Sequence, residues 1–186
     1  MKLQVKLTKG NNLITNNKFD SGYDLMAKGI RRVINGELQP EHILDDNEVF
    51  QLAPNETVLI TTGVHIAPPN PVEISEGVYE VIEAQLRGRS GMSLKTDTNV
   101  KLGTIDNTYT SDIGVIFHNE SNQPQTFKKD DRLGQLVFNK VIKFMPEAII
   151  YVDELNETDR GNNGFGSSGV SGHPLFKEDK WNHLNL

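Results

Sequence analysis

The segment Thr57-Val58-Leu59-Ile60-Thr61-Thr62-Gly63-Val64-His65-Ile66 decides the fold class. It is rich in β-branched residues, which pack well on a pleated sheet, and Pro68-Pro69 ends it. Shorter apolar or alternating segments stand between turn residues at positions 3–7, 79–86, 113–117, 134–138 and 148–152. The best candidate for a short helix is residues 90–95. Many short strands with few helices predict an all-β protein, built as a jelly roll, sandwich or barrel.

Two stretches interrupt this strand pattern. Residues 30–55 are polar and poorly periodic, and we expect an insert there with a hairpin or a short helix near residues 40–47. Residues 70–77 are expected to form a loop. After Asp153 the chain becomes polar and glycine-rich, which is typical of a flexible arm. We therefore expect a folded domain over residues 1–152, an arm over 153–170 and an extra tail of unknown role over 171–186.

Composition and charge exclude several function classes. The 186 residues include no cysteine, so disulfides and cysteine-ligated zinc are ruled out. No apolar run reaches the roughly 20 residues of a membrane span, and the alternating N-terminus lacks the apolar block of a signal peptide. The net charge of −6 argues against general nucleic-acid binding. We expect a protein of the cytoplasm, or of the host cytoplasm if the source is viral, with no membrane partner.

Five short polar motifs follow one another along the chain. Together they supply glycine-exposed N–H donors, two arginines, hydroxyls, a carboxylate and an aromatic ring, which is what a nucleoside triphosphate requires. Such a ligand would also bring a divalent cation to offset its charge. The motifs are Ser21-Gly22-Tyr23-Asp24-Leu25, Gly88-Arg89-Ser90-Gly91-Met92, Gly103-Thr104-Ile105-Asp106-Asn107-Thr108-Tyr109, Asp131-Arg132-Leu133-Gly134-Gln135-Leu136-Val137 and Arg160-Gly161-Asn162-Asn163-Gly164-Phe165-Gly166-Ser167-Ser168-Gly169.

Each motif alone also has an ordinary structural interpretation. Arg89 could be a surface arginine in a turn, and Asp106 and Asn107 could be turn residues of a hairpin. Gln135 could face solvent on an alternating strand. The final motif matches G-x-G-x-x-G, yet no strand precedes it and no helix follows, so a dinucleotide-binding fold is excluded. A flexible tail has no need to expose Phe165, which favours a binding function for this segment.

In content and order the five motifs resemble those of the trimeric dUTP diphosphatases, from residue 1 to about residue 170. The resemblance implies a distorted jelly roll, a homotrimer with active sites shared between protomers, and a flexible C-terminal arm that closes over the nucleotide. It also implies the reaction, which is hydrolysis of dUTP to dUMP and pyrophosphate by attack of water on the α-phosphorus. The reaction lowers dUTP and supplies dUMP for dTTP synthesis.

The resemblance assigns roles residue by residue. Asp106 would be the catalytic base, Tyr109 would lie under the deoxyribose, and Gly103 with Thr104 would bind uracil through the backbone. The remaining contacts would be made by Arg89, Ser90, Gly91 and Gln135 at the α- and β-phosphates, by Arg160, Gly166, Ser167 and Ser168 at the γ-phosphate, and by Phe165 on the uracil ring. Mg²⁺ would be held mainly by the phosphates and water, with Asp24 reaching it through water.

The chain departs from the family pattern at two positions. Val100 stands where many relatives carry a uracil-binding asparagine, and Asn99 lies beside it, so either Asn99 or the backbone alone would read the base. Ser111 replaces a frequent glycine. A rival is dCTP deaminase, whose catalytic glutamate would align with Ile116, a residue that cannot transfer protons. A second rival is a regulatory role, because some viral relatives bind protein partners; segment 30–55 or the tail would form that surface.

Overall fold

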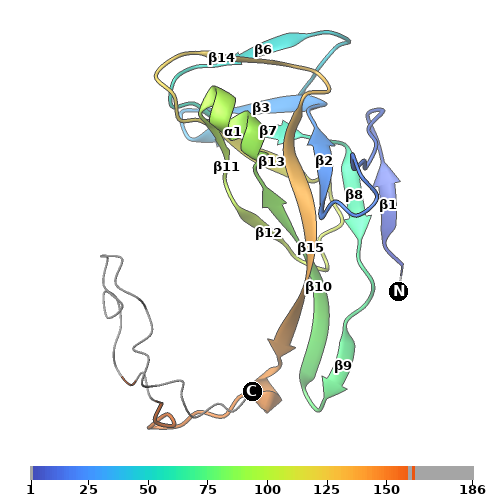
Figure 1. Cartoon of the computed structure of the whole chain (residues 1–186), viewed down its shortest axis with the longest axis vertical. Helices are drawn as coiled ribbons and strands as arrows, with labels where there is room; N and C mark the ends of the chain where they lie inside the picture. The colour runs from blue at the N-terminus through green and yellow to red at the C-terminus, as the bar shows by residue number, and fades with distance from the viewer. Residues whose placement is uncertain (1, 159–160, 162–186) are drawn as a thin grey trace, which may run out of the picture. The chain divides into compact units, whose positions relative to one another are not determined.

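The computed structural model describes residues 2–158 and residue 161 (Figure 1). The chain divides into two units, Met1–Ile149 and Ile150–Leu186. The first unit contains every strand found among the described residues, which confirms the prediction of an all-β protein. In the second unit, the described residues form neither a helix nor a strand. No helix among the described residues is long and apolar enough to cross a membrane.

Two antiparallel sheets carry most of the first unit. One sheet has the order β12-β10-β15-β2, with β9 also paired to β10, and its strands are β2 (Gly22–Met26), β9 (Val72–Ser75), β10 (Val78–Arg87), β12 (Gly103–Ile105) and β15 (Arg132–Phe144). The other has the order β11-β13-β7-β3-β4, with β5 also paired to β3, and its strands are β3 (Gly29–Ile34), β4 (Glu37–Leu38), β5 (His42–Ile43), β7 (Thr57–Thr61), β11 (Thr98–Val100) and β13 (Gly114–Asn119).

Two smaller antiparallel pairs and two short helices complete the unit. The pairs are β1 (Gln4–Leu7) with β8 (Val64–Ala67), and β6 (Val49–Leu52) with β14 (Gln125–Lys128). Helix α1 (Ser90–Thr96) follows the end of β10, where a short helix was predicted, and η1 (Pro146–Ala148) follows β15. In Figure 1, β10 and β15 are the longest strands and run side by side along their length. Their outer halves, with β9, extend beyond the rest of the sheet.

Three expectations from the sequence are wrong. Residues 148–152 form no strand, because Pro146 begins a short 3-10 helix and nothing in the described chain pairs with the residues after it. Residues 70–77 are not only a loop, since β9 pairs with β10 in a hairpin whose turn includes Gly77 at φ +67°. Of the two alternatives for the segment near residues 40–47, the helix is wrong: His42–Ile43 form strand β5, which pairs with β3, and β3 and β4 form a hairpin in the same segment.

The segment over residues 30–55 is part of the sheet framework and not a simple insertion. It holds β4, β5, β6 and most of β3. Ile30 is 5% exposed and lies opposite Ile60 in the β3–β7 register. The sequence pattern missed these strands because β4 and β5 are only two residues long, and most side chains of β3 beyond Ile30 are partly or fully exposed.

An aromatic cluster helps to fill the core at the β13 and β14 end. Phe117 is 1% exposed and packs edge-on against Phe127, with ring centroids 5.2 Å apart, and Phe127 also contacts Phe50 at 5.9 Å. The β13 pattern of alternating buried and less buried residues places Val115, Phe117 and Asn119 on the inner side. Of these three aromatic residues, the sequence pattern assigned only Phe117 to a strand, and it missed Phe50 on β6 and Phe127 on β14.

We predict that Phe117→Ala lowers the free energy of unfolding by about 3–5 kcal/mol, because it removes a buried aromatic ring and leaves a cavity. The matched control is Phe19→Ala, since Phe19 is 88% exposed and should change stability by less than about 0.5 kcal/mol. Urea unfolding at one fixed protein concentration measures both. Equal effects of the two substitutions would contradict this description of the core.

Candidate active site

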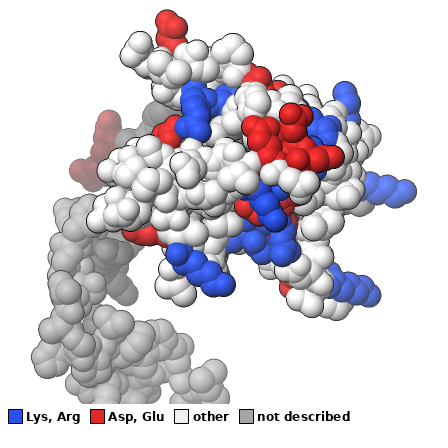
Figure 2. Space-filling view, turned by 90° about the horizontal axis from the view of Figure 1, so that it is seen from above, with Lys and Arg blue, Asp and Glu red and all other residues white. Residues whose placement is uncertain are grey.

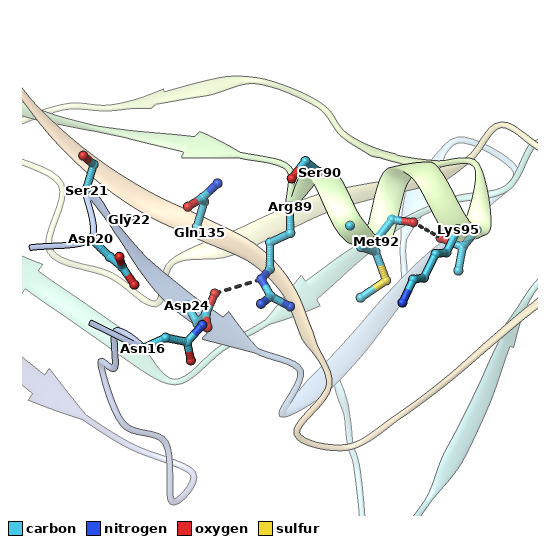
Figure 3. Close-up of a pocket in the computed structure, with 12 residues that line it drawn as sticks. Asn16, Asp20, Ser21, Gly22, Asp24, Arg89, Ser90, Met92, Lys95 and Gln135 are labelled. Atoms are coloured by element: carbon cyan, nitrogen blue, oxygen red, sulfur yellow. Dashed lines mark hydrogen bonds and ion pairs between the residues drawn. The ribbon is translucent and has the colours of Figure 1, made fainter. Parts of the chain in front are cut away.

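The register of the first sheet brings three of the five motifs to one place. Gln135 on β15 lies opposite Asp24 on β2 and opposite Arg87 on β10. Arg89 follows two residues after Arg87, at the start of helix α1. A cavity of about 660 Å³ opens between these elements (Figure 3) and is lined by Asn16, Asp20, Ser21, Gly22, Asp24, Arg89, Ser90, Gly91, Met92, Lys95, Thr96 and Gln135. We call it the arginine pocket.

Asp24 holds the side chain of Arg89, which lines the arginine pocket, through an ion pair. Its carboxylate is only 6% exposed and accepts from Arg89 Nε at 2.9 Å and from Arg132 Nη1 at 2.9 Å. Arg89 Nη1 also donates to the carbonyl oxygen of Arg132 at 3.2 Å. A guanidinium has five N–H donors, so these bonds leave several for an anion. No local sequence pattern predicted that Asp24 pairs with two arginines contributed by two other motifs.

Gln135 faces the arginine pocket and is not a solvent-facing strand residue. Its Nε2 donates to the carbonyl oxygen of Gly88 at 2.9 Å, which ties β15 to the turn before Arg89. A Cβ atom on Gly22 would lie 2.0 Å from Gln135 Oε1, so any other residue at position 22 would force the Gln135 carboxamide to move. The first and fourth motifs are thus complementary in shape.

The third motif lines a different pocket. Gly103, Thr104 and Ile105 form β12, and Asp106 follows at its end with an exposed side chain. The backbone N–H of Tyr109 donates to the carbonyl oxygen of Asp106 at 3.0 Å, which closes the turn between them. The cavity measures about 220 Å³ and is lined by Leu86, Lys101, Gly103, Thr104, Ile105, Asp106, Tyr109, Ile113, Gly114 and Ile116. We call it the aspartate pocket.

Neither Asn99, a candidate for reading the base, nor its neighbour Val100 lines the aspartate pocket. Asn99 directs its amide away, donating from Nδ2 to Glu120 Oε1 at 3.0 Å, and Val100 is buried in the core at 1% exposure. The backbone of β12 is therefore the available polar surface for a base. Ile116, where a deaminase would place its glutamate, lies in the wall of this pocket. An isoleucine there supplies no proton-transfer group.

Asn107 acts as an anchor, and sequence reasoning missed this. Its side chain Nδ2 donates to the carbonyl oxygens of Pro69 and Ile82, both at 3.0 Å. These bonds hold the turn that carries Asp106 against β10 and the segment after β8. The sequence indicated only that an asparagine suits a turn at this position.

The two pockets share no lining residue in the part of the chain that is described. Arg89 and Asp106 therefore do not meet in one cavity of a single protomer. Five predicted binding residues lie outside the described residues: Arg160, Phe165, Gly166, Ser167 and Ser168.

No group of three or more metal-ligating side chains occurs among the described residues. In the arginine pocket, both oxygens of Asp24 already bond to guanidinium groups. On the face shown in Figure 2, basic side chains are interspersed with acidic ones, and the described residues there form no continuous basic patch.

Comparison with known proteins identifies the family. A family model for dUTPase matches residues 46–169. The chain is 34% identical over 178 residues to the deoxyuridine 5'-triphosphate nucleotidohydrolase of Heliobacterium modesticaldum, covering 94% of this chain and 100% of that relative. The structure of the Staphylococcus bacteriophage 80alpha dUTPase with dUPNHPP has a TM-score of 0.67 at 26% identity, covering 91% of this chain and 99% of that one.

A mutant dUTPase from phage phi11 of S. aureus, studied for its coordination of a structural Mg(II) ion, has the same fold, with a TM-score of 0.61 at 23% identity over 84% of this chain and 100% of that one. These similarities define a jelly-roll protein of the nucleotide-hydrolysing class. The chain belongs to the dUTPase family.

We predict that Arg89→Lys weakens binding of dUPNHPP by about tenfold to a hundredfold. A lysine cannot bond to Asp24, Arg132 and an anion together, and each lost charge-assisted bond contributes about 1.5–3 kcal/mol. Arg87→Lys is the control, because Arg87 is exposed and lines neither pocket. Isothermal titration calorimetry gives both dissociation constants. Similar values for the two variants would remove Arg89 from the binding site.

Proposed function

We propose that this protein hydrolyses dUTP to dUMP and pyrophosphate, which lowers dUTP and supplies dUMP for dTTP synthesis. One observation carries the proposal. The chain aligns over the whole length of a deoxyuridine triphosphate nucleotidohydrolase, and the four motifs within the described residues line two pockets of suitable chemistry. The enzyme is therefore a nucleotide diphosphatase, and deamination is disfavoured by Ile116.

Asp106 is the general base in this mechanism. Its carboxylate takes a proton from a water molecule as the water oxygen forms a bond to the α-phosphorus. The bond from the α-phosphorus to the bridging oxygen breaks in line, and pyrophosphate leaves. The exposed carboxylate at the end of β12 supports this role, as does its neighbour Tyr109 in the same pocket. Tyr109 lies under the deoxyribose, and the backbone at Gly103 and Thr104 bonds to uracil.

The arginine pocket binds the phosphates. Arg89, Ser90 and Gly91 contact the α- and β-phosphates, and Gln135 assists at the α-phosphate. Asp24 supports this role by holding the Arg89 guanidinium in one orientation before the substrate arrives, which reduces the cost of ordering it.

The C-terminal arm completes the phosphate contacts. Arg160, Gly166, Ser167 and Ser168 bind the γ-phosphate side, and Phe165 stacks on uracil. The family match, which reaches residue 169, supports a role for this segment.

Mg²⁺ is the proposed metal, held mainly by the three phosphates and water. The donor set fits this arrangement, because the described residues offer no cage of three or more ligands and Mg²⁺ commonly retains water and phosphate ligands. The ion would offset the charge of the triphosphate. Asp24 could contact the ion only through water, since its oxygens already bond to Arg89 and Arg132.

The functional unit is proposed to be a homotrimer with three shared sites. The separation of the two pockets within one protomer supports this proposal, because residues from different copies must then complete each site. Exposed apolar surface supports it as well. Ile150, Tyr151 and Leu155 are 83%, 91% and 86% exposed, and Phe144 at the end of β15 is 54% exposed. Such surface favours burial against another chain.

The protein is proposed to act in the cytoplasm, or in the host cytoplasm if its source is viral. A second candidate function is regulation through a protein partner. The 80alpha work describes phage dUTPases as controlling transfer of virulence genes by a G protein-like mechanism. In this chain, segment 30–55 exposes Val33, Ile34 and Val49 by 52–58%, and this surface or the tail over residues 171–186 could bind such a partner. Loss of partner capture when the tail or these residues are altered would test the idea.

We predict that Asp106→Asn binds dUTP with little change in affinity and lowers kcat by at least about a thousandfold, because asparagine cannot accept the proton of the attacking water. Asp45→Asn is the control, since Asp45 is exposed and lies outside both pockets. Pyrophosphate release with Mg²⁺ present gives kcat, and calorimetry gives affinity. Normal turnover by the Asp106 variant would remove the general-base assignment.

We also predict that the purified chain sediments as a species of three times its 20.8 kDa mass. Replacing Ile150 and Tyr151 with serine should shift the population toward smaller species, because it removes apolar surface proposed to be buried between copies. Sedimentation velocity over a range of concentrations measures this. A stable monomer that is fully active would contradict the trimeric arrangement.

A further inference from the structure

The loop from Asp106 to Asp112 joins β12 to β13 and carries both Asp106 and Tyr109. Asn107 anchors its first half, as described above. The second half has a separate anchor in Asp112, a residue outside the five motifs. Tyr109 lies between the two anchors and is 45% exposed, so little packing holds its ring. The position of the ring therefore depends on hydrogen bonds within the loop.

Asp112 makes contacts in two directions. Its backbone carbonyl oxygen accepts a hydrogen bond from Tyr109 Oη at 3.0 Å. Its carboxylate Oδ1 accepts from the backbone N–H of Gly63 at 2.8 Å and from that of Thr62 at 3.3 Å. Thr62 and Gly63 form the tight turn between β7 and β8, and Gly63 has φ +69°. The Tyr109 ring is thus linked through one residue to a rigid turn of the framework.

A lysine from the N-terminal segment secures the carboxylate. Lys9 Nζ lies 2.7 Å from Asp112 Oδ2 and 2.5 Å from Glu41 Oε1. The side chains of these residues are 21–29% exposed, so solvent screens the pairs less than it screens an open surface pair. Partial burial disfavours the charged forms of Lys9 and Glu41. The bonds that Lys9 makes with Asp112 and Glu41 outweigh this effect, so the pKa of Lys9 is raised and the pKa of Glu41 is lowered. Glu41 also accepts a bond from the Thr61 hydroxyl.

We infer that Asp112, held by Lys9, is a positioning residue that fixes the Tyr109 ring and thereby selects deoxyribose over ribose. The inference rests on the proposed function, in which Tyr109 lies under the sugar. A 2′-hydroxyl is small, so a ring excludes it only when the ring is held within a fraction of an ångström. If the loop is released, the ring can move away and admit the ribose of UTP. Glu41 extends this support into segment 30–55.

The test compares kcat/KM for dUTP with kcat/KM for UTP. Asp112→Ala should lower the dUTP/UTP ratio by at least about tenfold, mainly through a higher KM for dUTP and a relative gain with UTP. Asp112→Asn keeps an acceptor for the Gly63 N–H but loses the charge that faces Lys9. Its dUTP/UTP ratio should therefore lie between those of Asp112→Ala and the parent chain. Tyr109→Phe removes only the hydroxyl and should reproduce the loss. Asp45→Asn is the control and should leave the ratio unchanged.

Three outcomes separate this inference from its alternatives. If Asp112 acts through Tyr109, the double variant Asp112→Ala with Tyr109→Phe loses no more selectivity than either single variant. The inference would be overturned if folded Asp112→Asn and Tyr109→Phe lost kcat/KM equally with dUTP and UTP, so that the ratio did not change. In that case dUTP hydrolysis by the parent chain would still stand. A parent chain that releases no pyrophosphate from dUTP would instead refute the proposed function.

Discussion

The antiparallel register of β2, β15 and β10 is the constraint on which the site depends. It places Asp24 opposite Gln135, and Gln135 opposite Arg87, so three motifs, of which the first and fourth lie more than a hundred residues apart, meet at one end of a sheet. A shift of one residue would turn these side chains to the opposite face. The buried carboxylate of Asp24 then joins Arg89 and Arg132. The strand register and the ion pairs of Asp24 thus stabilise the same arrangement of the three motifs.

The proposed assembly links two observations on a single protomer. Arg89 and Asp106 line different pockets, and the described residues after η1 expose large apolar side chains. In the proposed trimer, further copies of the chain would complete both pockets and cover these side chains. The free energy of association would then contribute to building the catalytic site, and activity would require association.

Much of this was predictable from the sequence. Alternating and β-branched segments identified β1, β7, β8, β10, β13 and part of β15, and the motifs identified the residues that line both pockets. The failures have physical causes. Residues 148–152 have strand composition but pair with no strand in the part of the chain that the structure describes, and β4 and β5 are too short to show periodicity. The roles of Asp24, Asn107 and Asp112 depend on contacts with residues distant in sequence, which no local pattern reveals.

Subunit mixing tests the central claim, that each active site combines the arginine pocket of one protomer with the aspartate pocket of another. Arg89→Ala and Asp106→Asn chains with different affinity tags are co-expressed, and only assemblies carrying both tags are purified. In a cyclic trimer, every such assembly has one site with both residues intact, so activity should return to about one third of the parent value. Mixed assemblies as inactive as either variant alone would place both residues of each site in one protomer and contradict the account.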